Sequence, residues 1–451
     1  MDLSIFKDYD IRGIYPDQLN ADVVKKIAYA IVRKFSPKSI AMCRDMRLSG
    51  KELRDAMVEV FVSLGVDVYD AGLVGTEIQY FIAGTKPYDL VLMLSASHNP
   101  PQYNGIKLVQ KGPIAVTSES GLFAIRDLLN ENPLPNAETP GKVTDIDVMD
   151  EWKDKIRSLV NLSSFKPLKV VVDAGNGMAG KLIPKAFEDL PFEVKSLFMD
   201  LDGTFPNHVP NPLIESNNIT LIETVRKEKA DLGLTFDGDA DRVFLIDDKG
   251  RFVSGTITSA LLARYILRKY PGELILYNAI CGKVVPETIQ KYGGKSKRVR
   301  VGHSYIKQYM KETGAIFAGE HSGHYYWRDY FRAESGALTS LIILSLLSDE
   351  TKKLSEIVDE LSIYPASGEI NFVLADIPKT LDLLRKGFPD AKSTDEVDGI
   401  SVWYDQYWFN VRASKTEPLL RLNVEADTGE ILKQKTDELV TKIESFGGKR
   451  K

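Results

Sequence analysis

The apolar residues of this chain follow two spacings that alternate along most of its length. Short runs rich in Val, Ile and Leu alternate with stretches in which apolar residues recur every three or four positions. The runs predict strands near Ile40 and at 90–94, 169–172, 232–236, 273–277 and 315–318. The longer spacing predicts helices at 22–35 and 181–190, and a helix opened by Ser49 and Glu52, which have the spacing of a capping box. This order predicts largely parallel sheets covered by helices.

The pattern changes from about Pro365. Alternating apolar positions predict strands at 369–373, 401–404 and 419–424, and a helix is expected at 429–446. Turn-forming residues predict linkers at 131–141, near Asp248 and at 363–368. We therefore predict an α/β protein in which three consecutive α/β domains, with mixed and largely parallel sheets, surround a central cleft and precede a smaller C-terminal α+β domain. The expected boundaries are 1–145, 146–249, 250–364 and 365–451.

The composition is typical of a globular protein. With 451 residues and 43% hydrophobic content, the chain can form several ordinary cores. A net charge of -5 gives no general attraction to nucleic acid. The longest apolar stretch, 338–347, is too short to span a bilayer and predicts a buried helix, so no membrane partner is expected. The low cysteine count and an N-terminus without a signal-peptide pattern favour the reducing cytoplasm.

Three aspartates follow the expected strand 232–236 at alternate positions, namely Asp237, Asp239 and Asp241. Carboxylates so close in sequence repel one another unless a cation joins them. The small residues Gly238 and Ala240 allow the loop to curl, as oxygens around one Mg²⁺ at about 2.1 Å require. A calcium-binding EF-hand loop is disfavoured because Arg242 occupies the position that needs glycine. The loop predicts a metal site, with a solvated acidic turn as the alternative.

A second polar loop, at 95–100, follows the expected strand 90–94 and contains Ser97 beside His98. A serine there is exposed in a stiff loop and could be a nucleophile next to its base, although adjacent residues seldom point at the same atom. The surrounding residues do not form the GxSxG elbow, which disfavours an α/β-hydrolase. The sequence leaves a functional and a merely structural Ser97 both open.

Two further loops carry polar side chains. The loop 319–324 reads GEHSGH, which fits hydrogen bonds to a polyhydroxylated ligand, a zinc site or a simple polar turn. The loop 412–418, between strands of the last domain and followed by Arg421, offers a guanidinium, an ammonium and hydroxyls that suit a phosphate dianion. A charged hairpin facing solvent is the alternative for this loop. The serine loop 95–100, the aspartate loop 237–242 and the loop 319–324 each follow an expected strand. Their similar placement predicts that they form three walls of one cleft.

A glycine pattern after the strand 169–172 suggests a dinucleotide-binding turn, with Gly175, Gly177 and Gly180 in GxGxxG spacing. Asp173 precedes the first glycine and would place negative charge beside a pyrophosphate. The pattern is therefore interpreted as structural, and dinucleotide binding remains a minor alternative.

Taken together, the loops resemble those of the α-D-phosphohexomutase superfamily, and most closely its phosphomannomutase/phosphoglucomutase members. The resemblance rests on YDIRG at 9–13, SASHNPPQYNGIK at 95–107, DGDADR at 237–242, GEHSGH at 319–324 and RASKTEP at 412–418. The segment CRDMRLSG at 43–50 is also similar to a family segment. The motifs occur in the family's order and extend over nearly the whole chain.

The resemblance implies a role for each matching residue. Ser97 would be carried as a phosphoserine and would bind Mg²⁺ together with Asp237, Asp239 and Asp241, while Arg12, Lys107 and His324 would complete the catalytic set. The implied substrate-binding residues are His98, Arg242, Glu320, Ser322, Arg412, Ser414, Lys415, Thr416 and Arg421. The family loop usually reads SNTEP, so Lys415 in place of asparagine is a departure that leaves its hydrogen bonding open.

The implied activity is that of an intramolecular phosphotransferase, an isomerase. Phosphate would move between O1 and O6 of a hexose, mannose or glucose, through a phosphoserine enzyme and a hexose 1,6-bisphosphate. A phosphoglucosamine mutase is the first alternative, although such enzymes tend to carry glutamine where His321 stands. A metal-dependent sugar phosphatase and a non-catalytic sugar-phosphate sensor are further alternatives. The expected partners are hexose phosphates and the 1,6-bisphosphate, and the sequence leaves a monomer or a homodimer open.

Overall fold

A computed structural model of the protein describes residues 2–414 and 419–451. Its internal contacts divide the chain into two compact units. The first unit comprises Met1–Val253 and Ser322–Ser355, and the second comprises Ser254–His321 and Glu356–Lys451. No helix of the described residues is long and apolar enough to cross a membrane.

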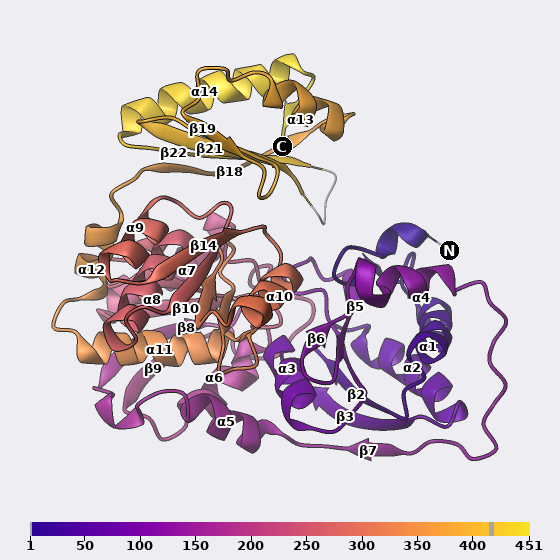
Figure 1. The fold of residues 1–451 in the computed structure, drawn as a ribbon. Coiled ribbons are helices and arrows are strands. Elements are labelled where there is room, and N and C mark those ends of the chain that lie inside the picture. Colours follow the sequence, from indigo (N-terminus) through magenta and orange to yellow (C-terminus); the bar gives the residue numbers. More distant parts are fainter. Residues whose placement is uncertain (1, 415–418) are drawn as a thin grey trace. The chain divides into compact units, whose positions relative to one another are not determined.

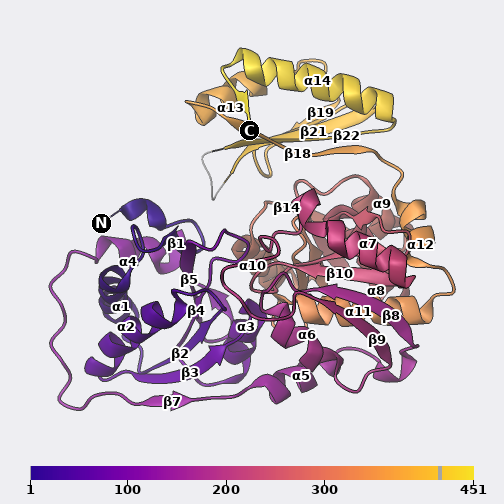
Figure 2. The same ribbon diagram turned by 180° about the vertical axis from the view of Figure 1, so that it is seen from behind.

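The first unit begins with a mixed sheet of strands in the order β1-β5-β4-β2-β3-β7, with β6 paired to β5. The central pairs β4·β2 and β2·β3 are parallel, whereas β1·β5 and β5·β4 are antiparallel. Helices α1, α2 and α4 lie on one side of this sheet and α3 on the other (Figures 1 and 2). The elements are η1 (Leu3–Ile5), β1 (Ile11–Ile14), α1 (Ala21–Phe35), β2 (Ser39–Arg44), α2 (Gly50–Ser63), β3 (Asp67–Leu73), α3 (Thr76–Thr85), β4 (Leu90–Leu94), β5 (Tyr103–Gln110), β6 (Ile114–Ala115), η2 (Ser118–Leu122), α4 (Phe123–Asp127) and β7 (Val143–Asp145).

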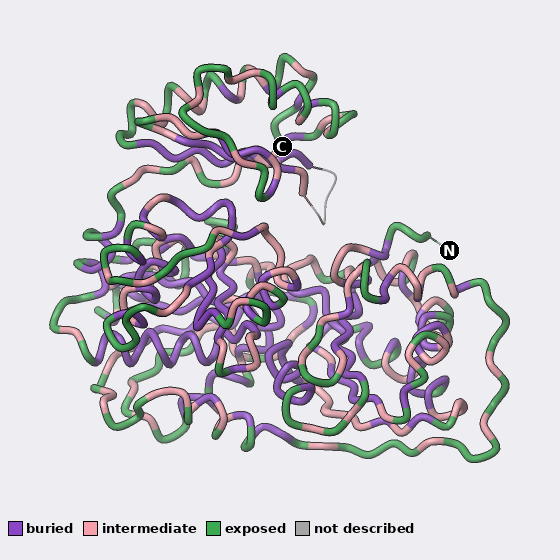
Figure 3. Tube along the Cα trace, in the orientation of Figure 1, coloured by how far each residue is buried: buried purple, intermediate pink, exposed green. Residues whose placement is uncertain are grey.

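Alternate strand residues divide between the two faces of this sheet. Ile40, Met42, Leu90 and Leu92 point into the core formed with α1 and α2. Helix α1 begins at Asn20, whose side chain accepts a hydrogen bond from the backbone N–H of Val23. The linker from α4 to β7 is largely exposed, as the tube in Figure 3 shows.

A second mixed sheet of the first unit has the order β12-β11-β10-β8-β9. Strands β8, β9 and β10 are parallel, and β11 returns antiparallel to β10. Helix α7 lies in front of β8 and β10 in Figure 2. The elements of this part are α5 (Met149–Arg157), η3 (Leu162–Ser164), β8 (Leu168–Asp173), α6 (Ala179–Phe187), β9 (Phe192–Leu197), η4 (Glu215–Asn218), α7 (Ile219–Glu228), β10 (Leu232–Phe236), β11 (Val243–Asp247) and β12 (Phe252–Val253). The first unit also contains α11 (Gly336–Asp349) and the antiparallel pair β16 (Tyr325–Trp327) and β17 (Ala333–Glu334), which are not strands of this sheet.

The second unit contains a parallel sheet in which β13 pairs with β14 on one side and β15 on the other. Helix α8 begins at Ser254, whose hydroxyl caps the backbone N–H of Ile257. The elements of this part are α8 (Gly255–Lys269), β13 (Leu274–Asn278), α9 (Val284–Lys291), β14 (Lys295–Val299), α10 (His303–Thr313), β15 (Phe317–Gly319) and α12 (Leu354–Leu361).

The C-terminal part of the second unit is an antiparallel sheet in the order β19-β20-β21-β22-β18-β23. Helices α13 and α14 cover one face of it (Figure 1), where Leu384, Leu439 and Ile443 pack on the apolar strand residues. Its elements are β18 (Ala366–Val373), α13 (Ile377–Arg385), β19 (Ser393–Asp395), β20 (Ile400–Trp403), β21 (Tyr407–Ala413), β22 (Leu420–Ala426), α14 (Gly429–Ser445) and β23 (Lys449–Arg450). The predicted fold class, α/β domains followed by an α+β domain, is confirmed.

Most predicted elements occur within a few residues of their expected bounds, and the strands at 90–94 and 232–236 have the predicted limits. The apolar stretch 338–347 lies within α11 and is buried, as predicted (Figure 3). The linker prediction at 363–368 is wrong in part, because β18 begins at Ala366 and continues the sheet beside β22.

The predicted capping box at α2 is wrong. Ser49 makes no side-chain capping bond, since its backbone is already helical. Its hydroxyl instead accepts a hydrogen bond from Asn104 Nδ2 at 2.8 Å, and the carboxylate of Glu52 accepts one from the hydroxyl of Tyr15 at 2.6 Å. Tertiary partners therefore replace the local cap.

Candidate functional site

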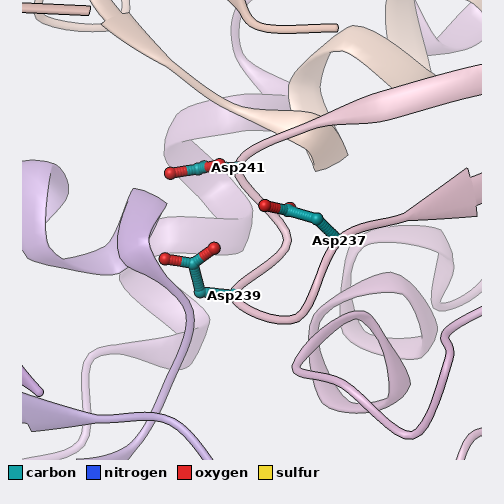
Figure 4. Close-up of side chains that lie close together, drawn as sticks. All are labelled: Asp237, Asp239 and Asp241. Carbon is teal, nitrogen blue, oxygen red and sulfur yellow. The ribbon is translucent and has the colours of Figure 1, made fainter. Parts of the chain in front are cut away.

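The three aspartates converge at the end of a buried strand. Asp237, Asp239 and Asp241 lie on the turn between β10 and β11, and their carboxylates face one space (Figure 4). Each has at least one carboxylate oxygen within 4.8 Å of the other two residues' oxygens. The turn curls because Ala240 adopts a left-handed backbone with φ of 62° and its N–H bonds to the carbonyl of Asp237. The solvated-turn alternative is wrong, because all three aspartates are buried.

Gly238 is required by the close approach of another loop. A Cβ atom at this position would lie 2.5 Å from the carbonyl oxygen of Ser97. Gly177 is similarly constrained, since its Cβ would lie 2.8 Å from the carbonyl oxygen of Gly238. The glycine pattern that suggested a dinucleotide turn therefore serves, at Gly177, the packing of backbone against the aspartate loop.

Lys107 on β5 provides a positive charge beside the triad. Its Nζ lies 2.7 Å from Asp239 Oδ2 and 3.1 Å from Asp241 Oδ2. Burial alone would lower the pKa of Lys107, but these two carboxylates outweigh that effect and raise it, so the side chain stays protonated. The lysine offsets part of the negative charge that the three aspartates bring into the interior.

Asp239 receives several donors on one oxygen. Its Oδ2 accepts hydrogen bonds from Thr76 Oγ1 at 2.6 Å, Ser95 Oγ at 3.2 Å and Lys107 Nζ at 2.7 Å. Burial and Asp241 act to raise the pKa of Asp239, but the contacts with Lys107 and Thr76 outweigh them and lower it. The other oxygen, Oδ1, is buried and has no hydrogen-bond donor among the described residues.

The donor set fits a hard divalent cation. Magnesium prefers carboxylate oxygens, and an orphaned buried carboxylate oxygen costs free energy unless a cation or donor reaches it. Burial and the carboxylates of Asp241 and Asp239 raise the pKa of Asp237 well above its ordinary range. By contrast, Lys107, His324 and Arg242 overcome the effect of burial and hold the pKa of Asp241 well below its usual value. The residues present could therefore bind a metal ion.

Ser97 lies directly beside this triad. It is 2% exposed, and its Oγ donates a hydrogen bond to Asp237 Oδ2 at 2.6 Å. Its backbone is left-handed with φ of 48°, which is uncommon outside glycine. The expectation that a serine at this loop is exposed is wrong, since the aspartate loop covers its hydroxyl.

His98 also approaches the Ser97 hydroxyl. Its Nδ1 lies 3.2 Å from Ser97 Oγ, so the expectation that these adjacent side chains point at different atoms is wrong. The left-handed turn at Ser97 brings the two together. Burial, followed by the charges of Arg242 and Arg12, holds the pKa of His98 well below its usual range, so the ring is neutral at pH 7.

Arg12 and Arg242 border the same site within the first unit. Arg12 donates to Asn99 Oδ1 at 2.6 Å and pairs with Asp10 Oδ2 at 2.5 Å. The backbone N–H of Arg242 donates to Asp237 Oδ1 at 3.1 Å, while its Nε lies 3.5 Å from Asp237 Oδ2. Both guanidinium groups therefore border the serine loop or the aspartate turn.

His324 links the aspartate turn to the GEHSGH loop. Its Nε2 accepts from Arg242 Nε at 3.1 Å and lies 3.5 Å from Asp241 Oδ1. Its Nδ1 lies 3.0 Å from the hydroxyl of Ser322. The backbones of Arg242 and His324 also form a β-bridge, which fixes this contact.

Glu320 and His321 belong to the second unit. Glu320 is 1% exposed, and its Oε1 accepts from Asn278 Nδ2 at 3.2 Å and from the backbone N–H of Gly302 at 3.3 Å. The ring of His321 bonds to the hydroxyl of Thr256 at 2.9 Å. Within the ranges 2–414 and 419–451, the aspartate triad is the one group of three or more potential metal ligands, so the zinc alternative has no ligand set there.

The predicted phosphate loop joins β21 to β22. Arg412 and Arg421 are register partners on these strands, and both guanidinium groups approach Glu369, at 3.0 and 3.3 Å. The backbone N–H of Ser414 bonds to the carbonyl of Leu419 at 2.8 Å and closes the hairpin. Lys415 and Thr416 lie outside the described residues.

Several residues of this site were not predicted from the sequence. Thr76, Asn99 and Glu369 contact Asp239, Arg12 and the arginine pair, respectively. Thr76 begins α3 and Glu369 lies in β18, and neither position has a local pattern that marks it. Asn99 stands in the quoted serine motif, so that motif was the available signal for it.

Four sequence profiles of the phosphoglucomutase/phosphomannomutase family match the chain in order. The alpha/beta/alpha domains I, II and III and the C-terminal domain match residues 3–134, 150–250, 254–364 and 369–442. These ranges contain Ser97, the aspartate triad, the GEHSGH loop and the arginine pair.

Individual proteins match at full length. A phosphomannomutase of Methanocaldococcus jannaschii is 37% identical over 446 residues, 97% of this chain and 97% of that protein. Proteins of Xanthomonas campestris named phosphohexose mutases include one that is 36% identical over 442 residues, 97% of this chain and 99% of that protein. The crystal structure of a phosphoglucomutase/phosphomannomutase family protein from Burkholderia thailandensis has a TM-score of 0.90 and 31% identity, and the match covers 99% of this chain and 98% of that chain.

Proposed function

The chain belongs to the phosphoglucomutase/phosphomannomutase family of phosphohexose-isomerising enzymes, and from this premise we propose that it moves phosphate reversibly between O1 and O6 of a hexose. One observation carries the proposal. Ser97 Oγ lies 2.6 Å from a carboxylate of the aspartate triad, so a phosphoryl group on this serine would stand beside a metal site. The names of its relatives support a hexose phosphate as substrate.

In the proposed reaction, Ser97 carries the phosphoryl group that is transferred. The free hydroxyl of a hexose 1-phosphate attacks this phosphorus, the bond to Ser97 Oγ breaks, and a hexose 1,6-bisphosphate forms. After the bisphosphate turns around, Ser97 Oγ takes the phosphoryl group from O1 and leaves the 6-phosphate.

Asp237, Asp239 and Asp241 would hold Mg²⁺ together with a phosphate oxygen on Ser97. When bound, the ion neutralises charge on the phosphoryl oxygens during transfer. Two observations support this assignment. Asp239 Oδ1 is buried without a hydrogen-bond donor among the described residues, and the pKa of Asp237 is raised by burial and by the carboxylates of Asp241 and Asp239, which the nearby positive charge does not balance. Manganese or another hard cation would satisfy the same oxygens.

Three cationic side chains are proposed to compensate the phosphoryl charge as well. Lys107 stays protonated between Asp239 and Asp241, Arg12 is anchored to the serine loop through Asn99, and Arg242 borders Asp237. Fixed positive groups of this kind stabilise a transition state without reorganising at the moment of transfer.

His324 is proposed as the group that takes the proton of the attacking hydroxyl. Its Nδ1 and Nε2 are oriented by Ser322 and Arg242, so the ring has one defined position in the first unit. His98, held neutral beside Ser97, is proposed as a contact to the substrate.

Glu320 and Ser322 are proposed to bind sugar hydroxyls. Arg412, Ser414, Lys415, Thr416 and Arg421 are proposed to hold the phosphate that does not react. Glu369 supports this role for the arginines, because one carboxylate aligns two guanidinium groups and leaves a net positive charge for a dianion.

The test compares mannose, glucose and glucosamine 1-phosphates as substrates, with Mg²⁺ and a trace of the matching bisphosphate. We expect appearance of the 6-phosphate from the mannose and glucose substrates, little from glucosamine, and phosphate on Ser97 by mass spectrometry. Ser97→Ala should abolish the activity, while Ser158→Ala, which removes a hydroxyl that donates to the carbonyl of Lys155 at 2.7 Å, should not. Full turnover by Ser97→Ala contradicts the proposal, and steady release of inorganic phosphate without 6-phosphate indicates a phosphatase.

A further inference from the structure

Arg47 holds the loop that carries Ser97 by its backbone. Its Nη2 donates to the carbonyls of Ser97 at 2.9 Å and Asn99 at 2.6 Å. Its Nη1 donates to the carbonyls of Pro100 and Tyr103, both at 2.8 Å. All four N–H groups of the two terminal nitrogens are therefore directed at one loop.

The guanidinium is itself fixed from the opposite side. Its Nε lies 3.3 Å from Asp45 Oδ2, and the side chains of both residues are fully buried. Asp45 Oδ1 also accepts the backbone N–H of Arg47 at 3.0 Å. The ring of Phe205 lies 5.3 Å from the guanidinium carbon. A buried cation with one carboxylate and four carbonyls has little freedom to move, because each displacement breaks a charge-assisted hydrogen bond.

The loop needs such a clamp for two reasons. The left-handed backbone of Ser97 is unfavourable for a residue with a Cβ and persists only where its surroundings enforce it. In addition, four carbonyl oxygens that point to one place repel one another unless a donor with several N–H groups joins them. Arginine meets this need with a planar fork, whereas lysine presents its donors from a single atom.

The same carbonyl connects the clamp to the aspartate turn. The carbonyl of Ser97 that Arg47 binds is the atom that a side chain at Gly238 would strike at 2.5 Å. On its other side, Ser97 bonds through Oγ to Asp237 and through its N–H to Ser95 Oγ at 2.9 Å. A shift of the carbonyl would therefore move Oγ relative to the aspartate turn.

We propose that Arg47 is a positioning residue that aims Ser97 Oγ for phosphoryl transfer by holding the carbonyls of the 97–103 loop. It contacts only backbone atoms of the loop and no reacting atom. The inference rests on the proposed role of Ser97. Because a misplacement of about 1 Å can cost about 10²-fold in rate, loss of the clamp should appear in kcat more than in substrate affinity.

The test uses Arg47→Lys, which keeps a cation beside Asp45 but cannot reach four carbonyls with the same geometry. The double variant Asp45→Asn, Arg47→Met removes both charges, so no buried carboxylate is left without its cation. Arg226→Lys is the control, since Arg226 also donates to loop carbonyls, those of Lys249 and Gly250, away from the site. For each variant, the melting temperature, the phosphate content of Ser97, kcat, KM and the single-turnover rate of transfer from labelled phosphoenzyme are measured.

We expect kcat and the single-turnover rate of both Arg47 variants to fall about 10²-fold, with KM within about threefold of the unmodified enzyme and full phosphorylation of Ser97. Arg226→Lys should keep both rates. Unchanged rates in the Arg47 variants overturn the inference, and so does a loss of rate that a lower folded fraction explains. In either case, phosphate on Ser97 leaves the mutase proposal standing. Absence of phosphate on Ser97 in the unmodified enzyme overturns the mutase proposal and this inference together.

Discussion

Thr76→Val removes a single hydroxyl from the support of the aspartate triad. Thr76 Oγ1 donates to Asp239 Oδ2 at 2.6 Å, and both atoms are buried. Valine has nearly the same shape, and the backbone N–H at position 76 would still bond to the carbonyl of Asp239, as it does at 3.1 Å. The change therefore deletes the hydrogen bond to Asp239 and the one that Oγ1 accepts from Lys107 Nζ at 3.2 Å.

The expected effect is on metal affinity. A hydrogen bond to a charged group contributes about 1.5–3 kcal/mol, and loss of a partner that orients a ligand carboxylate typically weakens metal binding about 10–100-fold. The two figures agree, since a factor of ten corresponds to about 1.4 kcal/mol. The lysine contact to Asp239 at 2.7 Å remains, so we expect the lower half of this range.

The assay is titration of chelator-treated protein with Mg²⁺ by calorimetry, together with the dependence of kcat on free Mg²⁺. Thr85→Val is the matched control, because Thr85 lies on the same helix and donates its hydroxyl to the carbonyl of Phe81 at 2.7 Å. Thr76→Val should need more Mg²⁺ for half-maximal rate and reach nearly the same rate at saturation. Equal Mg²⁺ affinities in the two variants would refute the role given to this hydrogen bond.

Lys107→Met removes the cation that lies between Asp239 and Asp241, so it should lower the free energy of unfolding of the metal-free protein by about 3–5 kcal/mol. The control Lys86→Met removes an exposed ion pair with Glu151 and should cost about 0–1 kcal/mol. Equal melting temperatures of the two variants would contradict this prediction. Removal of the phosphate from Ser97 should weaken Mg²⁺ binding in calorimetry if a phosphate oxygen is a ligand, and an unchanged dissociation constant would show that the triad binds the ion by itself. Burial raises the pKa of Glu77 to about 8, against the opposing hydrogen bonds from Ser335 and the backbone of Ala337, so the folded state holds a proton that the unfolded state releases near its ordinary value of 4.5. Stability should therefore fall as pH rises from 4.5 to 8 and level off above it, and Glu77→Gln should flatten this slope in thermal unfolding measured across the range; an unaltered slope would place the titration elsewhere.

Local sequence patterns were sufficient for most of the secondary structure. The run at 90–94 is apolar throughout, and the run at 232–236 is apolar apart from Thr235. A short, nearly continuous apolar run is typical of a strand that is buried on both faces. The predicted capping box at Ser49 is wrong, because the Ser49 hydroxyl accepts a hydrogen bond from Asn104, which lies 55 positions away in the chain. A local pattern predicts a local bond only where no tertiary partner competes for the same group.

The site divides in the same way. Asp237, Asp239 and Asp241 were recognisable because three carboxylates in five residues are costly without a cation, and Ser97 was recognisable within its motif. That Ser97 Oγ meets Asp237 across 140 positions, and that Thr76 reaches Asp239 across 163, depended on the pairing of distant strands and helices. Glu369 beside the two arginines depended on the register between β18 and β22.

The sequence by itself therefore determined the elements and the chemical groups of this protein, because spacing and residue type act over a few neighbouring positions. Only the tertiary structure decided which groups come into contact. It buries Ser97, and it directs the hydrogen bonds of Arg47 to the carbonyls of the Ser97 loop. These contacts arise from the packing of segments far apart in the chain, where burial removes water as a competing partner and makes each hydrogen bond and ion pair depend on the geometry of the whole fold.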